Sequence, residues 1–154
     1  MAFSIPITDV HSWLLAEFPN LRNEQHNVTS LYTDEYNCVA WAAADTERWW
    51  WPSQNGYWPE DLPLVDSVEN FVRAFQELNY QPCDDASFEA GYEKVVVYVG
   101  ADGRVKHMAR QLDANTWTSK LGQAWDIEHA SPQGVECKTY GQVAQFLKRP
   151  VKTE

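Results

Sequence analysis

The run KVVVYVG at residues 94–100 limits the folds open to this chain more than any other segment. β-Branched and aromatic residues favour extended backbone, and an unbroken apolar run of this length suits a strand buried on both faces. The sequence ADGR follows at 101–104, and its Asp-Gly pair is typical of a tight turn. Two further short runs, 107–113 and 116–122, are separated by a second turn at 114–115. Together these segments predict an antiparallel meander.

Helical patterns dominate the half of the chain before the meander. A short helix is expected over residues 9–18, and small apolar residues predict a buried helix over about 39–48. The clearest helical pattern begins where Asp66 and Glu69 can form a capping box ahead of five apolar side chains on one face. The segment 140–149 fits a strand or a helix, and we favour a strand because it would complete the sheet. Helices followed by a meander predict an α+β domain.

Length and charge narrow the class of protein. The chain has 154 residues, enough for one domain spanning 1–154 with a real core. Its formal charge of −10 argues against a duplex nucleic-acid binder and against an anionic membrane surface, because both attract basic residues. The acidic surface would instead suit a basic protein partner.

Targeting and cofactor motifs are absent from the sequence. The first residues carry no basic region and no long apolar run, so no secretory signal is expected. Three cysteines are an odd number for a disulfide framework, which indicates a reducing compartment such as the cytoplasm, with export by a signal-less route as the alternative. No phosphate loop, His-Glu-x-x-His or paired Cys-x-x-Cys occurs, so neither a cofactor nor a metal is predicted.

One cysteine stands in a position suited to nucleophilic chemistry. Asn37 is a good helix N-cap, which puts Cys38 at the first position of the small-residue helix. The helix dipole there favours a thiolate, and free backbone amides can stabilise an oxyanion. The alternative is an inert core thiol, the usual state of a free cysteine. Cys83 is followed by two acidic residues and Cys137 has no capping context, so we interpret both as structural or surface residues.

A nucleophilic cysteine needs a histidine as its base. His107 stands at the start of a predicted strand, directly after the first turn of the meander. His11, on the N-terminal helix, and His26, in a polar loop, are less suited. His129 follows the hairpin and is either a third member of the site or a solvated residue.

The residue that orients the histidine depends on the hairpin. With a three-residue loop, His107 shares a face with Ser119, whereas a two-residue loop puts Thr118 and Lys120 on that face. Asp126, expected in a following loop, is the best anion nearby. The sequence therefore leaves Ser119 and Asp126 as alternatives.

Aromatic residues near these positions could contact a substrate. Several tryptophans follow the nucleophile helix in a proline-rich loop, where they would line a groove or fill the core. The amide of a polar residue on the first hairpin strand could bind a substrate carboxylate or amide. The candidate substrate-binding residues are Asn37, Trp50, Trp51, Trp58, Gln111 and Trp117.

Several phrases resemble those of an uncharacterised bacterial protein family across about residues 30–150. They are NCVAWAAAD, WWWP, YWP, EKVVVY, HMARQL, WTSKLG, DIEH and YGQVAQFLKRP. More distantly, a helix-borne Cys38 followed by a strand-borne His107 is similar to papain-like cysteine peptidases of the cell-wall amidase type. The chain departs from the usual Asp-Cys-Ser-Gly of those amidases, with Asn37-Cys38-Val39-Ala40 in its place.

The resemblance implies a papain-like domain with helices packed on a β-meander. It also implies a cysteine-dependent hydrolase or acyltransferase that acts on a peptide or another amide, with Cys38 attacking and His107 moving the proton. The alternative is a non-catalytic module that keeps this scaffold and binds a peptide or glycan.

Overall fold

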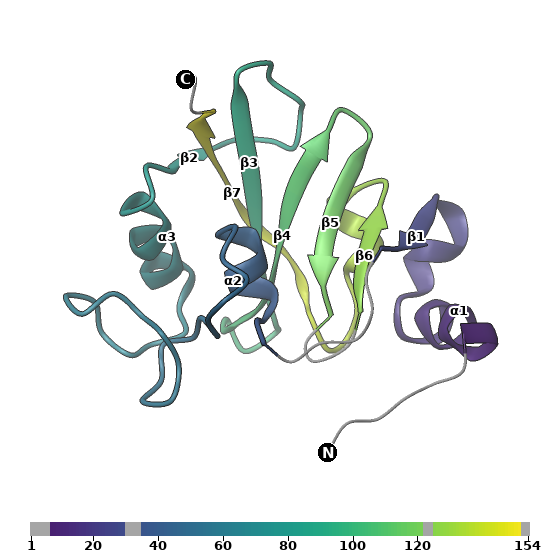
Figure 1. Cartoon of the computed structure of the whole chain (residues 1–154), viewed down its shortest axis with the longest axis horizontal. Coiled ribbons are helices and arrows are strands. Elements are labelled where there is room, and N and C mark those ends of the chain that lie inside the picture. Colours follow the sequence, from purple (N-terminus) through teal and green to yellow (C-terminus); the bar gives the residue numbers. More distant parts are fainter. Residues whose placement is uncertain (1–6, 30–34, 122–124, 152–154) are drawn as a thin grey trace.

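The structure, a computed structural model, describes residues 7–29, 35–121 and 125–151. Within these ranges the strands form one sheet of seven, in the order β1-β6-β5-β4-β3-β7-β2 (Figure 1). The elements, in chain order, are α1 (Ile7–Glu17), η1 (Pro19–Asn23), β1 (His26–Val28), α2 (Cys38–Ala42), α3 (Val68–Gln76), β2 (Gln81–Cys83), β3 (Tyr92–Val99), β4 (Val105–Asp113), β5 (Thr116–Lys120), β6 (Asp126–His129), η2 (Pro132–Val135) and β7 (Gln142–Pro150).

The middle of the sheet is the predicted meander. Strands β3, β4, β5 and β6 are neighbours in both sequence and space, and every pair is antiparallel. The expectation of an α+β domain is therefore confirmed, as is that of a strand near residues 140–149. This last strand, β7, does not follow β6 at the end of the meander but lies beside β3, its first strand. It pairs with β3 on one side and with β2 on the other.

Apolar layers cover both faces of the sheet, which explains the unbroken run in β3. Val95 and Val97 pack in one cluster with α2 and α3, and we call this side the α2 face. Val96 and Tyr98 pack in a second cluster with α1 and η1, on the side that we call the α1 face. Alternate residues of one strand thus serve two layers, so a polar residue in this run would be buried on either side.

Helix α2 is shorter than expected. It ends at Ala42 instead of continuing to residue 48. Ala44 takes a left-handed conformation (φ 61°), and the amide of Asp45 bonds back to the Ala40 carbonyl at 2.9 Å, which closes the helix. The Asp45 carboxylate then accepts a 2.9 Å hydrogen bond from Trp50 Nε1. Small apolar residues therefore predicted a buried helix at the right place but gave no signal for its end.

The N-cap of helix α3 lies one residue later than proposed. Ser67, and not Asp66, is the N-cap, and its hydroxyl accepts from the amide of Asn70 at 3.2 Å. The short strands β1 and β2 were not expected, because three residues carry too little periodicity to stand out from a loop. Among the helices of the described residues, none has the length and apolar character needed to cross a membrane.

Candidate active site

The start of α2 holds the candidate nucleophile in a rigid frame. Asn37 caps the helix as predicted, since its side-chain oxygen accepts from the amide of Ala40 at 3.1 Å. The same side chain donates to the carbonyl of Trp50 at 2.6 Å and accepts from the Trp50 amide at 3.0 Å. Asn37 therefore ties the tryptophan-rich loop to the helix, and its polar atoms are engaged within the protein.

The thiol of Cys38 is buried at the base of the α2 face. Burial raises its pKa to about 11, although the backbone amides of Met108, Val39 and Cys38 itself lie against the sulfur and favour its anion. The expectation that the helix N-terminus would yield a thiolate is thus wrong for this state. Desolvation outweighs the amides, and the group is a neutral thiol at pH 7.

The hairpin between β4 and β5 decides which polar residue meets His107. The turn has two residues, 114–115, and pairs Asp113 with Thr116. A bulge at Leu112 then shifts the register by one residue, so that Gln111 pairs with Trp117. This is the register expected for a three-residue loop, and it puts His107 and Ser119 on the same face. Their Nε2 and Oγ atoms lie 3.0 Å apart.

A second histidine extends this contact into a buried polar array. Nε2 of His129 lies 2.8 Å from Oγ of Ser119, and its Nδ1 lies 2.7 Å from the carbonyl oxygen of Ser131. All three side chains of the array are buried. From the sequence, His129 is either a third member of the site or a solvated residue. The alternation in DIEH, which puts His129 on the same face as Ile127, was the signal that it points inward.

Both histidines of the array are electrically neutral at pH 7. Burial lowers the pKa of His107 well below its usual 6.5, and the nearby His129 lowers it further. Burial likewise lowers the pKa of His129 to about 4, against the opposing effect of its bond to Ser131. Nδ1 of His107 is buried and has no hydrogen-bond partner among the described residues. One ring nitrogen of His107 is therefore available for proton transfer.

Cys38 and His107 lie on opposite faces of β4. His107 points to the α1 face, where it contacts Tyr98, while the next residue, Met108, packs on the α2 face. The backbone amide of Met108 lies against the Cys38 sulfur. Met108 is two residues along β4 from Arg110, whose pair with Thr118 is the last between β4 and β5. Among the described residues no hydrogen bond joins Cys38 to His107.

Asp126 lies apart from the histidines. It begins β6, and its Oδ2 accepts a 2.8 Å hydrogen bond from the hydroxyl of Tyr36, a residue of the α2 face. The following residue, Ile127, packs on the α1 face, so Asp126 points away from it. Of the two alternatives for orienting His107, the structure brings Ser119 to the ring and keeps Asp126 on the opposite side of the sheet.

The other expected substrate contacts are occupied by the fold. Trp50, Trp58 and Trp117 are at most 7% exposed and belong to the two apolar clusters. Trp51 is half-buried, with its ring edge-on to Phe71 at 5.4 Å. The Gln111 amide donates to the Ala86 carbonyl at 2.9 Å. We therefore assign the tryptophans to apolar packing and Gln111 to a hydrogen bond that holds the backbone.

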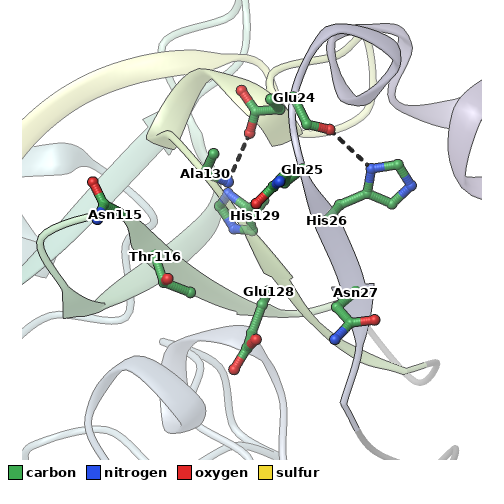
Figure 2. A pocket seen from close by; sticks show the side chains of 9 residues that line it. All are labelled: Glu24, Gln25, His26, Asn27, Asn115, Thr116, Glu128, His129 and Ala130. Carbon is green, nitrogen blue, oxygen red and sulfur yellow. Dashed lines mark hydrogen bonds between the residues drawn. The ribbon is translucent and has the colours of Figure 1, made fainter.

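A polar hollow of about 400 Å³ adjoins the outer end of the histidine array (Figure 2). Its back is formed by His129 and Ala130, and the Glu24 carboxylate caps the Ala130 amide at 3.0 Å. His26, on the neighbouring strand, bonds the Glu24 carbonyl at 3.2 Å. In residues 7–29, 35–121 and 125–151, no three His, Cys, Asp or Glu side chains cluster closely enough to hold a metal ion. The remaining residues around the hollow are Gln25, Asn27, Asn115, Thr116 and Glu128.

Comparison with known proteins places the chain in a family. The model of a domain of unknown function, DUF7689, matches residues 27–148, which is most of the chain and includes every residue of the array. Neither the curated proteins nor the solved structures gave a match. The chain therefore belongs to the DUF7689 family.

Proposed function

We propose that this member of the DUF7689 family is a cysteine-dependent hydrolase or acyltransferase that acts on an amide bond. One observation carries the proposal. His107 is bonded through Nε2 to a buried polar residue and keeps a buried, unpartnered Nδ1, while the amide of the next residue touches the Cys38 sulfur. Nucleophilic catalysis by cysteine requires a base that a polar residue orients and that can reach the thiol. Ser119 orients His107, and the proposal requires the Cys38 thiol, on the other face of β4, to reach Nδ1 when substrate binds.

The proposed reaction begins with a neutral pair. The Cys38 sulfur attacks the amide carbon as its proton passes to Nδ1 of His107, and a C–S bond forms. The backbone amide of Cys38 helps to bind the negative oxygen of the tetrahedral intermediate. The C–N bond then breaks, and His107 returns the proton to the leaving amine. Water or a second amine attacks the thioester and releases the acyl group, which restores the thiol.

A neutral thiol is compatible with this sequence of steps. Proton transfer and sulfur attack can be concerted, so a standing thiolate is not needed. Hydrogen bonds between catalytic groups are often long without substrate and shorten when it binds. The pKa of Cys38 near 11 and the depressed pKa of His107 argue for this route and against a resting ion pair.

Element order supports a papain-like arrangement. A helix beginning at the nucleophile packs on an antiparallel meander, the base stands on a meander strand, and the next strand supplies the polar residue behind it. The likeness lies in the order of the helix and strands and in the roles of the three residues, so the papain-like fold is itself part of the proposal. The alternative of a peptide- or glycan-binding module has less support, because three of the four tryptophans expected to line its groove are buried.

The experiment uses p-nitrophenyl acetate, a small activated acyl donor. We expect a burst of about one equivalent of p-nitrophenolate, with the acetyl group on Cys38 by peptide mass mapping. Cys38→Ala and His107→Ala should both remove the burst. The matched control is the double variant Cys83→Ala/Cys137→Ala, which deletes the other two free thiols and should keep it.

Two results would argue against the enzyme. Acetylation spread over Cys83 and Cys137, with Cys38 unmodified, would identify simple chemical labelling of exposed thiols. A burst that survives His107→Ala at the parent rate would show that Cys38 needs no base. In the first case the burial of Cys38 would mark it as a core thiol.

A further inference from the structure

We propose that His129 is a positioning residue that fixes, through Ser119, which nitrogen of His107 is free to accept a proton. The inference rests on the proposed function, because it assigns an outer layer to the same site. Among the described residues, His129 has no hydrogen bond to Cys38 or to Nδ1 of His107. The direction of each hydrogen bond can be followed in turn from the Ser131 carbonyl inward.

The first bond sets the tautomer of His129. A backbone carbonyl oxygen can only accept, so the 2.7 Å contact with Ser131 requires a proton on Nδ1 of His129. The ring is neutral at pH 7, because burial depresses its pKa to about 4. A neutral imidazole carries one N–H proton. Nε2 of His129 is therefore bare and can only accept.

The second and third bonds carry this direction to His107. Since Nε2 of His129 only accepts, the Ser119 hydroxyl must donate its single proton across the 2.8 Å contact. The Ser119 oxygen then has only lone pairs to offer, so Nε2 of His107 must be the donor across 3.0 Å. His107 is also neutral, and its Nδ1 is consequently bare.

This tautomer is the one that the proposed chemistry needs. The bare Nδ1 is buried and unpartnered among the described residues, so no other group of the described chain competes for its lone pair. If His129 lost its accepting nitrogen, the Ser119 hydroxyl could turn and donate to His107. The proton of His107 would then move to Nδ1, and the base would be lost.

Packing alone would not require two histidines and a serine at these buried positions. Two neutral histidines and a serine buried together cost desolvation energy that apolar residues of similar size would avoid. They are tolerated only when fully bonded, and here every polar atom of the three side chains is bonded except Nδ1 of His107. The one unsatisfied atom in the array is thus the atom that would accept the proton.

The test reads the tautomers directly by nitrogen-15 NMR of the imidazole rings at pH 7. Bare and protonated ring nitrogens have well-separated shifts, and the chain has only four histidines, which single His→Gln variants can assign. In the parent we expect a protonated Nδ1 on His129, and a protonated Nε2 with a bare Nδ1 on His107. This measurement needs no substrate.

Two variants of one position separate positioning from packing. His129→Gln keeps an accepting oxygen for Ser119 and should leave the tautomer of His107 unchanged. His129→Leu removes the acceptor and should move the His107 proton to Nδ1, wholly or in part. The acetylation rate of Cys38 should fall between about 10-fold and 10⁴-fold in His129→Leu, the range from a loosened support to a wrong tautomer, and recover in His129→Gln. His26→Leu, at the position paired with His129 on β1, is the matched control.

The outcomes are distinguishable from failure of the proposed function. A protonated Nδ1 on His107 in the parent would overturn the inference, even if His129→Leu does not fold. An unchanged His107 in a folded His129→Leu would overturn it as well. If the parent tautomer is as expected but p-nitrophenyl acetate leaves Cys38 unmodified, the directional array stands and the enzyme proposal fails.

Discussion

The ring of Tyr140 lies flat on the imidazole of His107, with 4.0 Å between the ring centroids and 1° between the planes. Tyr140 comes from the turn before β7, where Cys137 and Gly141 bridge the two sides of the turn. His107 is therefore held by Ser119 in its plane and by Tyr140 from above. A ring fixed in both directions presents Nδ1 at one constant angle.

Tyr140→Phe should keep the acetylation rate of Cys38 near that of the parent, because the stacked ring remains. Tyr140→Leu should lower it by up to about tenfold, since an aromatic pair contributes about 0.5–1.5 kcal/mol. The burst rate with p-nitrophenyl acetate measures both. A loss in Tyr140→Phe equal to that in Tyr140→Leu would show that the phenol oxygen, and not the stacked ring, is what the site uses.

Alkylation of Cys38 by iodoacetamide should be slow at pH 7 and rise with pH. Only the thiolate reacts, and a pKa near 11 means that its fraction grows about tenfold per pH unit up to that value. Peptide mass mapping between pH 7 and pH 10 gives the rates for all three cysteines. Cys83 and Cys137, which are partly exposed, should label before Cys38 at pH 7.

The same reaction in denaturant provides the control, because all three thiols should then label alike. Rapid labelling of Cys38 with a plateau below pH 7 would show a thiolate paired with a protonated His107. The resting state would then be an ion pair, contrary to the neutral pair argued above.

Cys38→Ala should lower the free energy of unfolding by about 1 kcal/mol, the cost of one buried atom of this size. Trp41→Ala should cost about 3 kcal/mol, the low end for a large aromatic, because Trp41 is only half-buried. Its loss also removes the ring stacked on Tyr36, with 5.5 Å between centroids, and the ring beneath Arg110, 4.6 Å from the guanidinium carbon. Denaturant melts of both variants beside the parent give the comparison. An equal loss would mean that Cys38 carries more of the packing than its size suggests.

Two glycines with nearly the same positive φ offer a matched pair. Gly91 has φ 85° and open space where a Cβ would stand, so Gly91→Ala should cost only about 1–2 kcal/mol of left-handed strain. Gly141 has φ 79°, but its Cβ would overlap the carbonyl of Val99. Gly141→Ala should therefore cost more than about 3 kcal/mol and displace the neighbouring Tyr140. Similar melts for the two variants would contradict the close approach of this turn to β3.

Strong local signals were enough to predict the central strands. The apolar run of β3, the Asp-Gly turn and the two short runs after it each favour one structure, and together they favour the meander. The position of β7 could not be predicted in this way, because pairing between strands distant in sequence leaves no local pattern. The early end of α2 depends on Ala44, a residue type that does not ordinarily mark a left-handed position.

The candidate site was predictable only in part where it depends on register, and not where it depends on burial. Counting along the two strands gives Ser119 for a three-residue loop alone, and the actual two-residue turn reaches that register through a bulge that the sequence does not mark. The pKa of Cys38 could not be predicted, because the helix end is visible in the sequence and the depth of the thiol is not. The sequence does not decide the role of His129, since its partner Ser131 lies beyond the strand in a segment with no regular pattern.

The place of β7 has a consequence for how the chain is synthesised. β3 needs β7 as its second neighbour, and about 40 residues must be made between them. The strand β2, made before both, has no partner in the described sheet other than β7. During translation the meander can form with one side of β3 still open, and β2 must wait as an unpaired segment. The open edge exposes unpaired backbone groups, and it closes only when the residues near 150 have left the ribosome.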